Sequence, residues 1–267
     1  MDIKRITSAL LGFPLVIAML LIGNKYIVDI AVAIIAILSI HEYFNAVSKV
    51  CKPIKWLGYG SCISIIFIHI IPSEYINIAA TLLISSIIGV LFSYVIFSNM
   101  KVSIKDIAYT SLGIIYIVFF SMFLALVDGM QHGGLIIWYV IFAAWGTDTF
   151  AYFVGRFLGK HKFSKISPKK TIEGCIGGTI GAVVMMLVYT YFINSNMYMN
   201  YSYIYIGIAG IILSLVGQIG DFAASSIKRF VDIKDYSNLI PGHGGMLDRI
   251  DSLIFISPFA YVIFNLL

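Results

Sequence analysis

Acidic residues, basic residues and glycines gather at 241–252, near the C-terminus of the chain. Glycines there surround His243, and Asp248, Arg249 and Asp251 follow them. Glycine lets a backbone approach a ligand closely, and its amides can hold an anion. Asp248 and Asp251 share one helix face if a helix begins there. Because packing alone does not call for two acids around an arginine, this segment predicts a ligand site.

A second segment, 217–232, carries a carboxylate, a hydroxyl and basic residues at helical spacing. If a helix continues through it, one stripe contains Asp221, Ser225, Lys228 and Asp232. Carboxylate oxygens suit magnesium, and Lys228 and Arg229 suit the non-bridging oxygens of a phosphate. The stripe favours a magnesium-bound phosphate ester, and the alternative is the solvated face of an interfacial helix.

Paired lysines form a third candidate. Lys169 and Lys170 follow Ser167-Pro168, a pair of residues typical of a turn. A helix is expected to open near Thr171, with Glu173 in its first turn. Helix N-termini and lysines both favour anions. The pair therefore predicts a phosphate-binding position, although ordinary basic flanking of a membrane helix explains it equally well.

The fourth candidate is Asp148, which lies within an apolar run. An ionisable group at such a place is costly and is a functional candidate by default. The alternative is a helix-packing acid that is bonded to a threonine or a tyrosine. Further along the same helix, Gly155 and Gly159 have the spacing of small residues that let two membrane helices approach closely.

The composition indicates which kind of secondary structure must position these residues. The chain has 267 residues, of which 60% are hydrophobic and 12% charged, against roughly 25% charged residues in soluble domains. This excludes a soluble globular enzyme and a disordered chain. Three cysteines without a CxxC spacing give neither a zinc site nor a disulfide framework. No phosphate-binding Walker loop, zinc-protease motif or nucleophile elbow is present.

The chain is therefore expected to be an all-α, polytopic integral membrane protein. A crossing needs about 20 apolar residues, and the long apolar run 174–220 is split at a polar break, 194–200. About nine transmembrane helices follow, at 6–24, 30–41, 56–73, 75–100, 107–127, 129–147, 174–193, 201–220 and 252–267.

Basic residues set the expected orientation. Lys4 and Arg5 precede the first span, so the N-terminus is placed in the cytoplasm and the C-terminus outside. Only Lys25 of the 18 basic residues then falls outside. Residues 1–130 are interpreted as five scaffold spans, and 131–267 as the part that carries a site at the cytoplasmic face.

The segment 225–251 resembles the signature of the phosphatidate cytidylyltransferases, also called CDP-diacylglycerol synthases. The residues that carry the resemblance are Ser225, Lys228, Arg229, Lys234, Asp235, Pro241, His243, Gly244, Gly245, Asp248, Arg249 and Asp251. The segments around Asp148 and 169–174 are also similar to family segments. The first 130 residues show only generic membrane character.

The resemblance implies that CTP and phosphatidate react, with magnesium, to give CDP-diacylglycerol and pyrophosphate at the bacterial inner (cytoplasmic) membrane. The implied partners are the two substrates and the lipid bilayer, without nucleic acid. The family also allows a homodimer and a second cation. Acyl-chain preference and the choice between CTP and dCTP are left open by the sequence.

Roles follow from this resemblance and from the chemistry of the residues. The expected metal ligands are Asp221, Asp248 and Asp251; the expected catalytic residues are Asp221, Asp248, Lys228, Arg229 and Ser225; and the expected substrate- or phosphate-binding residues are Lys169, Lys170, His243, Gly244, Gly245, Arg249 and Asp148. Asp148 could hold a metal, orient a lysine or contact the nucleotide. His243 is interpreted as a phosphate donor rather than a base, since phosphatidate is already anionic.

Two other classes remain as alternatives. A secondary transporter would use Asp148 and Asp221 as coupling groups, and it would place acids near the bilayer midplane within a matched inverted repeat. Another lipid-phosphate transferase, such as a CDP-alcohol phosphotransferase, would carry a different aspartate pattern that this sequence lacks.

Overall fold

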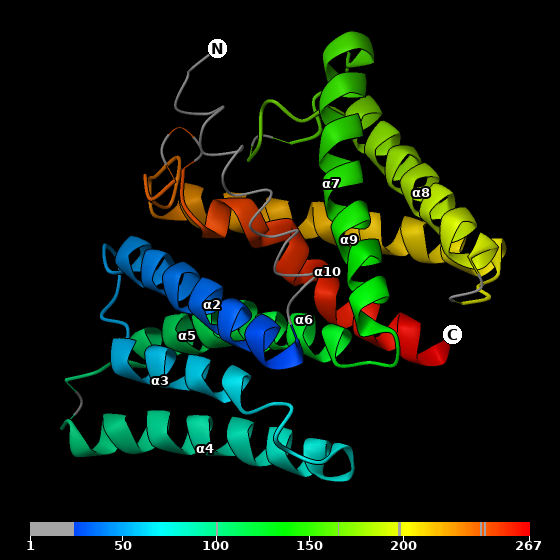
Figure 1. Ribbon diagram of the computed structural model, residues 1–267. Helices are drawn as coiled ribbons and strands as arrows, with labels where there is room; N and C mark the ends of the chain where they lie inside the picture. Colours follow the sequence, from blue (N-terminus) through cyan, green and yellow to red (C-terminus); the bar gives the residue numbers. More distant parts are fainter. Residues whose placement is uncertain (1–23, 100, 165, 197–198, 241, 243) are drawn as a thin grey trace. The chain divides into compact units, whose positions relative to one another are not determined.

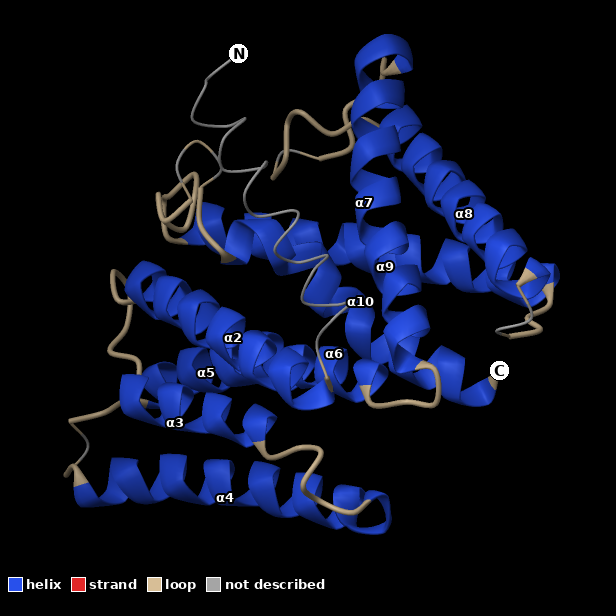
Figure 2. Ribbon diagram, in the orientation of Figure 1, coloured by secondary structure: helices blue, strands red, loops and turns tan. Residues whose placement is uncertain are grey.

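The computed structural model describes residues 24–267 except residues 100, 165, 197–198, 241 and 243 (Figure 1). Every regular element among these residues is a helix, and the only strand-like pairings there are two isolated bridges (Figure 2). The predicted all-α class is therefore confirmed for the described part of the chain.

The chain folds into two compact units. The first consists of the described residues up to Gly129 together with the segment Val231–Arg249. Its helices are α2 (Lys25–Val47), α3 (Lys55–Ile66), the short η1 (Ser73–Tyr75), α4 (Ile76–Phe97), α5 (Ile104–Gly113), the π-helical η2 (Ile114–Phe119) and α6 (Phe120–Asp128). Helix α2 packs against α3 and α6 (Figure 1).

Helix α2 forms the core of the first unit. Ile40, Tyr43 and Phe44 on this helix are completely buried. The Tyr43 hydroxyl donates a hydrogen bond of 2.9 Å to the carbonyl oxygen of Tyr109 in α5. Because large buried side chains and a hydrogen bond to a neighbouring helix fix the rotation of α2, these contacts also fix where the neighbouring Glu42 points.

A second polar contact holds the N-terminal end of α2. Asp29 is completely buried, and its two carboxylate oxygens lie 2.8 and 2.9 Å from Nδ1 of His69. This pair lies more than three turns before Glu42, roughly 20 Å along the helix axis. Asp29 therefore serves the packing of α2 at the end remote from Glu42.

The second unit consists of Met130–Phe230 and Ile250–Leu267. Its helices are α7 (Gly133–Leu158), α8 (Ile172–Ser195), α9 (Tyr203–Phe230) and the part of α10 (Leu247–Leu266) that starts at Ile250. Helix α7 packs along α8, and α9 packs on both (Figure 1).

Buried hydroxyls and one amide link α7, α8 and α9. Thr147 Oγ1 donates to Ser214 Oγ at 2.7 Å, and Gln218 Nε2 donates to Thr179 Oγ1 at 3.0 Å. Side-chain hydrogen bonds of this kind hold membrane helices together. Since Gln218 precedes Asp221 by about one turn of α9, the network fixes the part of the helix from which Asp221 projects.

Six helices of the described part are long and apolar enough to cross a membrane: Lys25–Val47, Ile78–Phe97, Ile104–Asp128, Gly133–Leu158, Ile172–Ser195 and Tyr203–Phe230. The predicted division of the run 174–220 is confirmed by α8 and α9. Helix α3 has 12 residues, and at about 18 Å it is shorter than the roughly 30 Å hydrocarbon core. The predicted span 6–24 lies outside the described residues.

Candidate active site

Lys170 and Asp221 form an ion pair within the second unit. Lys170 Nζ also lies 4.4 Å from the ring centroid of Phe222. The ring of Phe222 stacks on that of Phe163, with a centroid distance of 4.8 Å. The side chains of the ion pair are 24% and 26% exposed. Two candidates from separate segments of the sequence therefore meet at a place that an anion can reach.

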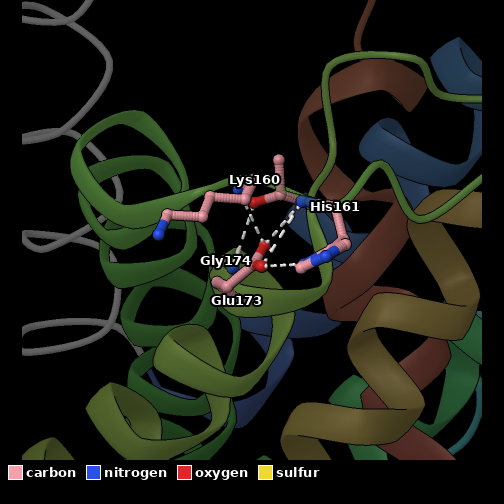
Figure 3. A network of polar contacts seen from close by, with 5 residues as sticks. Lys160, His161, Glu173 and Gly174 are labelled. Carbon is pink, nitrogen blue, oxygen red and sulfur yellow. Dashed lines mark hydrogen bonds and ion pairs between the residues drawn. The ribbon is translucent and has the colours of Figure 1, made fainter.

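Glu173 holds the loop that carries Lys170 (Figure 3). Its carboxylate accepts hydrogen bonds from the backbone N–H groups of Lys160, at 3.2 Å, and His161, at 3.3 Å, and it lies 2.6 Å from Nδ1 of His161. Further into the loop, the N–H of Phe163 donates to the carbonyl oxygen of Lys170 at 3.0 Å. Glu173, in the first turn of α8, thus holds the beginning of the loop 159–171 against the start of that helix.

The helices joined by this loop approach each other closely. A Cβ atom added at Gly174 of α8 would lie 2.9 Å from the carbonyl oxygen of Ala151 and 3.2 Å from Cα of Gly155, both in α7. A Cβ atom at Gly159 would lie 2.8 Å from Oγ1 of Thr171. The predicted role of Gly155 and Gly159 in close packing is therefore confirmed.

Three acids and a lysine of the second unit act on one another electrostatically. Asp251, which lies in α10 one turn after Leu247 and outside the six apolar helices, is only 7% exposed. Burial raises the pKa of its carboxyl group. The negative charges of Asp221 and Asp148 raise this pKa further, whereas Lys228 lowers it. A cation close to Asp251 would therefore stabilise the charged form of this carboxyl group.

The described residues contain no group of three or more His, Cys, Asp or Glu side chains placed to hold a metal ion. Magnesium does not require such a cage, since it commonly binds through one or two carboxylates and takes its other ligands from water and substrate phosphates. Asp221 and Asp251 supply carboxylates whose mutual repulsion a divalent ion would relieve. The donor set of the second unit therefore fits magnesium that is bound together with a phosphate substrate.

In the first unit, Asp248 contacts the backbone of the glycine-rich loop, which is residues 242–245. Its Oδ2 atom accepts hydrogen bonds from the backbone N–H groups of Tyr236, at 2.9 Å, and Gly245, at 3.1 Å. Gly244 has a φ of +84°, a conformation that favours glycine. Its carbonyl oxygen accepts a 2.9 Å bond from the N–H of Ile240. The sequence indicated Asp248 as a metal ligand but did not reveal these backbone contacts.

The other candidates lie along α9 or at exposed positions. Ser225 and Lys228 are half-buried, and Lys169, Arg229, Arg249 and Asp148 are exposed. Nε of Arg229 donates to the carbonyl oxygen of Ile166 at 3.4 Å. Helix α9 ends at Phe230, and Asp232 has a φ of +54°. The prediction that Asp232 continues the helical stripe is therefore wrong, because the backbone leaves the helix before it.

The roles predicted for His243, and the meeting of Asp221 with Asp248, stay predictions. His243 lies outside the described residues, as does Pro241. Asp221 belongs to the second unit and Asp248 to the first, so their convergence in one site is an expectation from the sequence.

The model of the cytidylyltransferase family matches residues 3–267. The chain belongs to this family. Proteins named phosphatidate cytidylyltransferase are similar to it along most of its length. The one from Staphylococcus haemolyticus is 32% identical over 260 residues, which cover 95% of each chain. The one from Staphylococcus aureus is 33% identical over 258 residues, again 95% of each. The one from Bacillus subtilis is 37% identical over 178 residues, 66% of this chain and 65% of its own.

The resemblance drawn from the segment 225–251 is thereby confirmed, and it extends to the N-terminal half that showed only membrane character. Sequence reasoning missed two acids that accept hydrogen bonds from backbone N–H groups beside the candidate residues. One is Glu173, which was noted only as a first-turn acid. The other is Glu42 of α2, which is 3% exposed and contacts the glycine-rich segment. An acid directly after the apolar run 30–41 was the available signal, and it resembles an ordinary helix end.

Proposed function

We propose that this chain transfers the cytidylyl group of CTP to phosphatidate, giving CDP-diacylglycerol and pyrophosphate. The observation that carries this proposal is the similarity over 95% of the chain to phosphatidate cytidylyltransferases. The geometry agrees with it, because the charged groups of the second unit suit phosphate and a divalent cation. This similarity favours the enzyme over the transporter considered above.

In this reaction a phosphate oxygen of phosphatidate attacks the α-phosphorus of CTP. A new P–O bond forms, the bond from the α-phosphorus to the bridging oxygen breaks, and pyrophosphate leaves with the bond electrons. Both substrates are anions, so the enzyme must mainly position them and neutralise their charge. No proton has to be removed from the attacking oxygen, since phosphatidate is already ionised.

We assign the neutralisation of phosphate charge to Lys170, Lys228 and Arg229. Lys170 is paired with Asp221, which keeps its ammonium group at the site. Ser225, Lys169, Arg249, His243 and the amides of Gly244 and Gly245 would orient the phosphates. Asp148 adds negative charge beside Asp251, which favours its indirect action on the cation site over direct contact with the nucleotide.

Magnesium would be held by Asp221 and Asp251, with Asp248 as a third ligand if the two units bring it there. Bound magnesium would withdraw electron density from the phosphate oxygens and lower the repulsion between the substrates. From the family resemblance, we include a second cation and a homodimer in this proposal.

A direct assay tests the proposed reaction. Purified protein is incubated with phosphatidate, magnesium and CTP labelled at the α-phosphate. We expect label in the organic phase as CDP-diacylglycerol, an equal amount of pyrophosphate, and neither product when phosphatidate is left out. If correctly folded protein formed no CDP-diacylglycerol, the proposal would be contradicted. Transport of an ion or solute into vesicles would then favour the transporter.

We further propose the topology predicted from the sequence: nine crossings in the bacterial inner membrane, the N-terminus and active site in the cytoplasm, and the C-terminus outside. Six crossings correspond to the apolar helices of the described part. The distribution of basic residues supports the orientation. If α3 does not cross the membrane, every loop after it lies on the opposite side from the one assigned here.

Labelling on both sides of α3 tests this topology. Single cysteines are placed at Lys52 and at Glu74, in a chain whose three natural cysteines are replaced by serine. We expect an impermeant maleimide to label position 74 from outside intact cells, and position 52 only after the inner membrane is permeabilised. Labelling of both positions from the same side would remove the α3 crossing and reverse the orientation of every later span.

A further inference from the structure

Glu42 lies in α2, among the helices that the sequence marks only as membrane scaffold, yet its carboxylate contacts the segment that carries the family signature. Oε1 of Glu42 accepts a 2.5 Å hydrogen bond from the hydroxyl of Ser237 and a 2.9 Å bond from the N–H of Met246. Oε2 accepts a 2.8 Å bond from the N–H of Leu247. All of these residues belong to the first unit.

The contacts of Glu42 satisfy groups that the fold would otherwise leave without partners. Met246 and Leu247 lie at the start of α10, where N–H groups have no acceptor within the helix. A carboxylate is a favourable acceptor there because it also opposes the positive end of the helix dipole. Glu42 thus caps α10 from a different helix, about 200 residues earlier in the chain.

The sequence of the glycine-rich loop fits this arrangement. A Cβ atom added at Gly245 would lie 2.5 Å from Oε2 of Glu42, so a larger residue there would displace the carboxylate. The N–H of Gly245 donates in turn to Asp248. Glu42 and Asp248 therefore hold the same short stretch of backbone from two sides, and Glu42 bonds to both residues that separate Gly245 from Asp248.

We propose that Glu42 is a positioning residue of the cytidylyl transfer reaction: it fixes the glycine-rich loop and the first turn of α10, and thereby the orientation of Asp248. This inference rests on the proposed function for its kinetic part. Its structural part, the immobilisation of the described residues 235–240 and 244–248, is measurable without any substrate.

The contacts of Glu42 explain why Glu42→Gln should have an effect although glutamine has the same size. Both carboxylate oxygens of Glu42 act as acceptors, so an amide of the same size must turn its NH2 group toward at least one N–H or O–H donor. We expect Glu42→Gln to lower kcat by about 10- to 100-fold, while KM for CTP changes less than about threefold. Such a split is typical of lost transition-state positioning rather than lost substrate binding.

A graded series tests whether the effect follows the hydrogen bonds. Glu42→Asp keeps both oxygens on a side chain one methylene shorter, and it should recover part of the kcat lost in Glu42→Gln. Ser237→Ala removes one of the three donors and should lower kcat by less than about threefold. Glu42→Ala should be at least as impaired as Glu42→Gln.

Asp29→Asn is the matched control, since it also removes a buried carboxylate from α2 but one that contacts His69 and not the loop. It should lower the midpoint of thermal unfolding, because removing one partner of a buried pair leaves the other unpaired. The kcat of the folded fraction should stay within about twofold of the unsubstituted protein. A comparable loss of kcat in Asp29→Asn would overturn the inference, since Glu42 would then act only through general stability.

Hydrogen exchange provides the readout that does not depend on catalysis. We expect the amides of 235–240 and 244–248 to exchange at least about tenfold faster in Glu42→Gln than in the unsubstituted protein, and to be unchanged in Asp29→Asn. Unchanged exchange in Glu42→Gln, or a kcat within twofold of the unsubstituted protein, would overturn the inference. If the unsubstituted protein formed no CDP-diacylglycerol, the proposed function would fail, whereas the exchange result would still decide whether Glu42 immobilises the loop.

Discussion

Asp221→Asn is expected to reduce kcat by about 1,000-fold or more while the protein still folds and inserts into the membrane. The carboxylate of Asp221 pairs with Lys170 and adds to the negative charge around Asp251. Loss of one preorganised electrostatic group typically costs about 100- to 1,000-fold in kcat. Asp221→Asn should exceed that range, because it removes a proposed metal ligand and leaves Lys170 without its carboxylate at the same time.

A nearby acid provides the control for Asp221→Asn. Asp232 is exposed and lies beyond the end of α9, and it is not one of the residues that carry the family resemblance. Asp232→Asn should therefore keep kcat within about twofold. The measurement is CDP-diacylglycerol formation at saturating CTP over a range of magnesium concentrations. Rates for Asp221→Asn like those of the unsubstituted protein would remove Asp221 from the active site.

Hydropathy was sufficient to predict helices because a chain in lipid must satisfy its backbone hydrogen bonds internally. The division of the run 174–220 into α8 and α9 followed from the polar residues 194–200. The length of α3 did not follow, because the apolar run 56–73 continues past the residue at which the helix ends. Residues after Ile66 form turns instead, and apolar composition alone does not distinguish a turn from a helix.

The spacing of residues along the chain was sufficient to predict individual site residues, but not which of them contact one another. Lys170 and Asp221 were each identified by the residues around them, but their pairing depends on how the loop before α8 docks on α9. Glu42 was missed for a similar reason. Its partner Ser237 is separated from it by 195 positions, and no local pattern connects an acid at the end of an apolar run with a glycine-rich loop so far along the chain.

Asp248 has a backbone-holding role in addition to its predicted role at the metal, and two substitutions separate these roles. The hydrogen bonds from the N–H groups of Tyr236 and Gly245 both go to the single atom Oδ2. An asparagine can place its carbonyl oxygen at that position and keep both bonds, whereas an alanine cannot. Asp248→Asn is therefore expected to preserve the glycine-rich loop while it removes the negative charge.

We expect Asp248→Asn to lower kcat about 100- to 1,000-fold, with hydrogen exchange of 236–245 changed by less than about threefold. Asp248→Ala should show the same kinetic loss together with exchange at least about tenfold faster. The opposite pattern, full activity in Asp248→Asn and loss only in Asp248→Ala, would mean that Asp248 acts through the backbone alone. Magnesium would then depend on Asp221 and Asp251, because the charge of Asp248 would contribute nothing to catalysis.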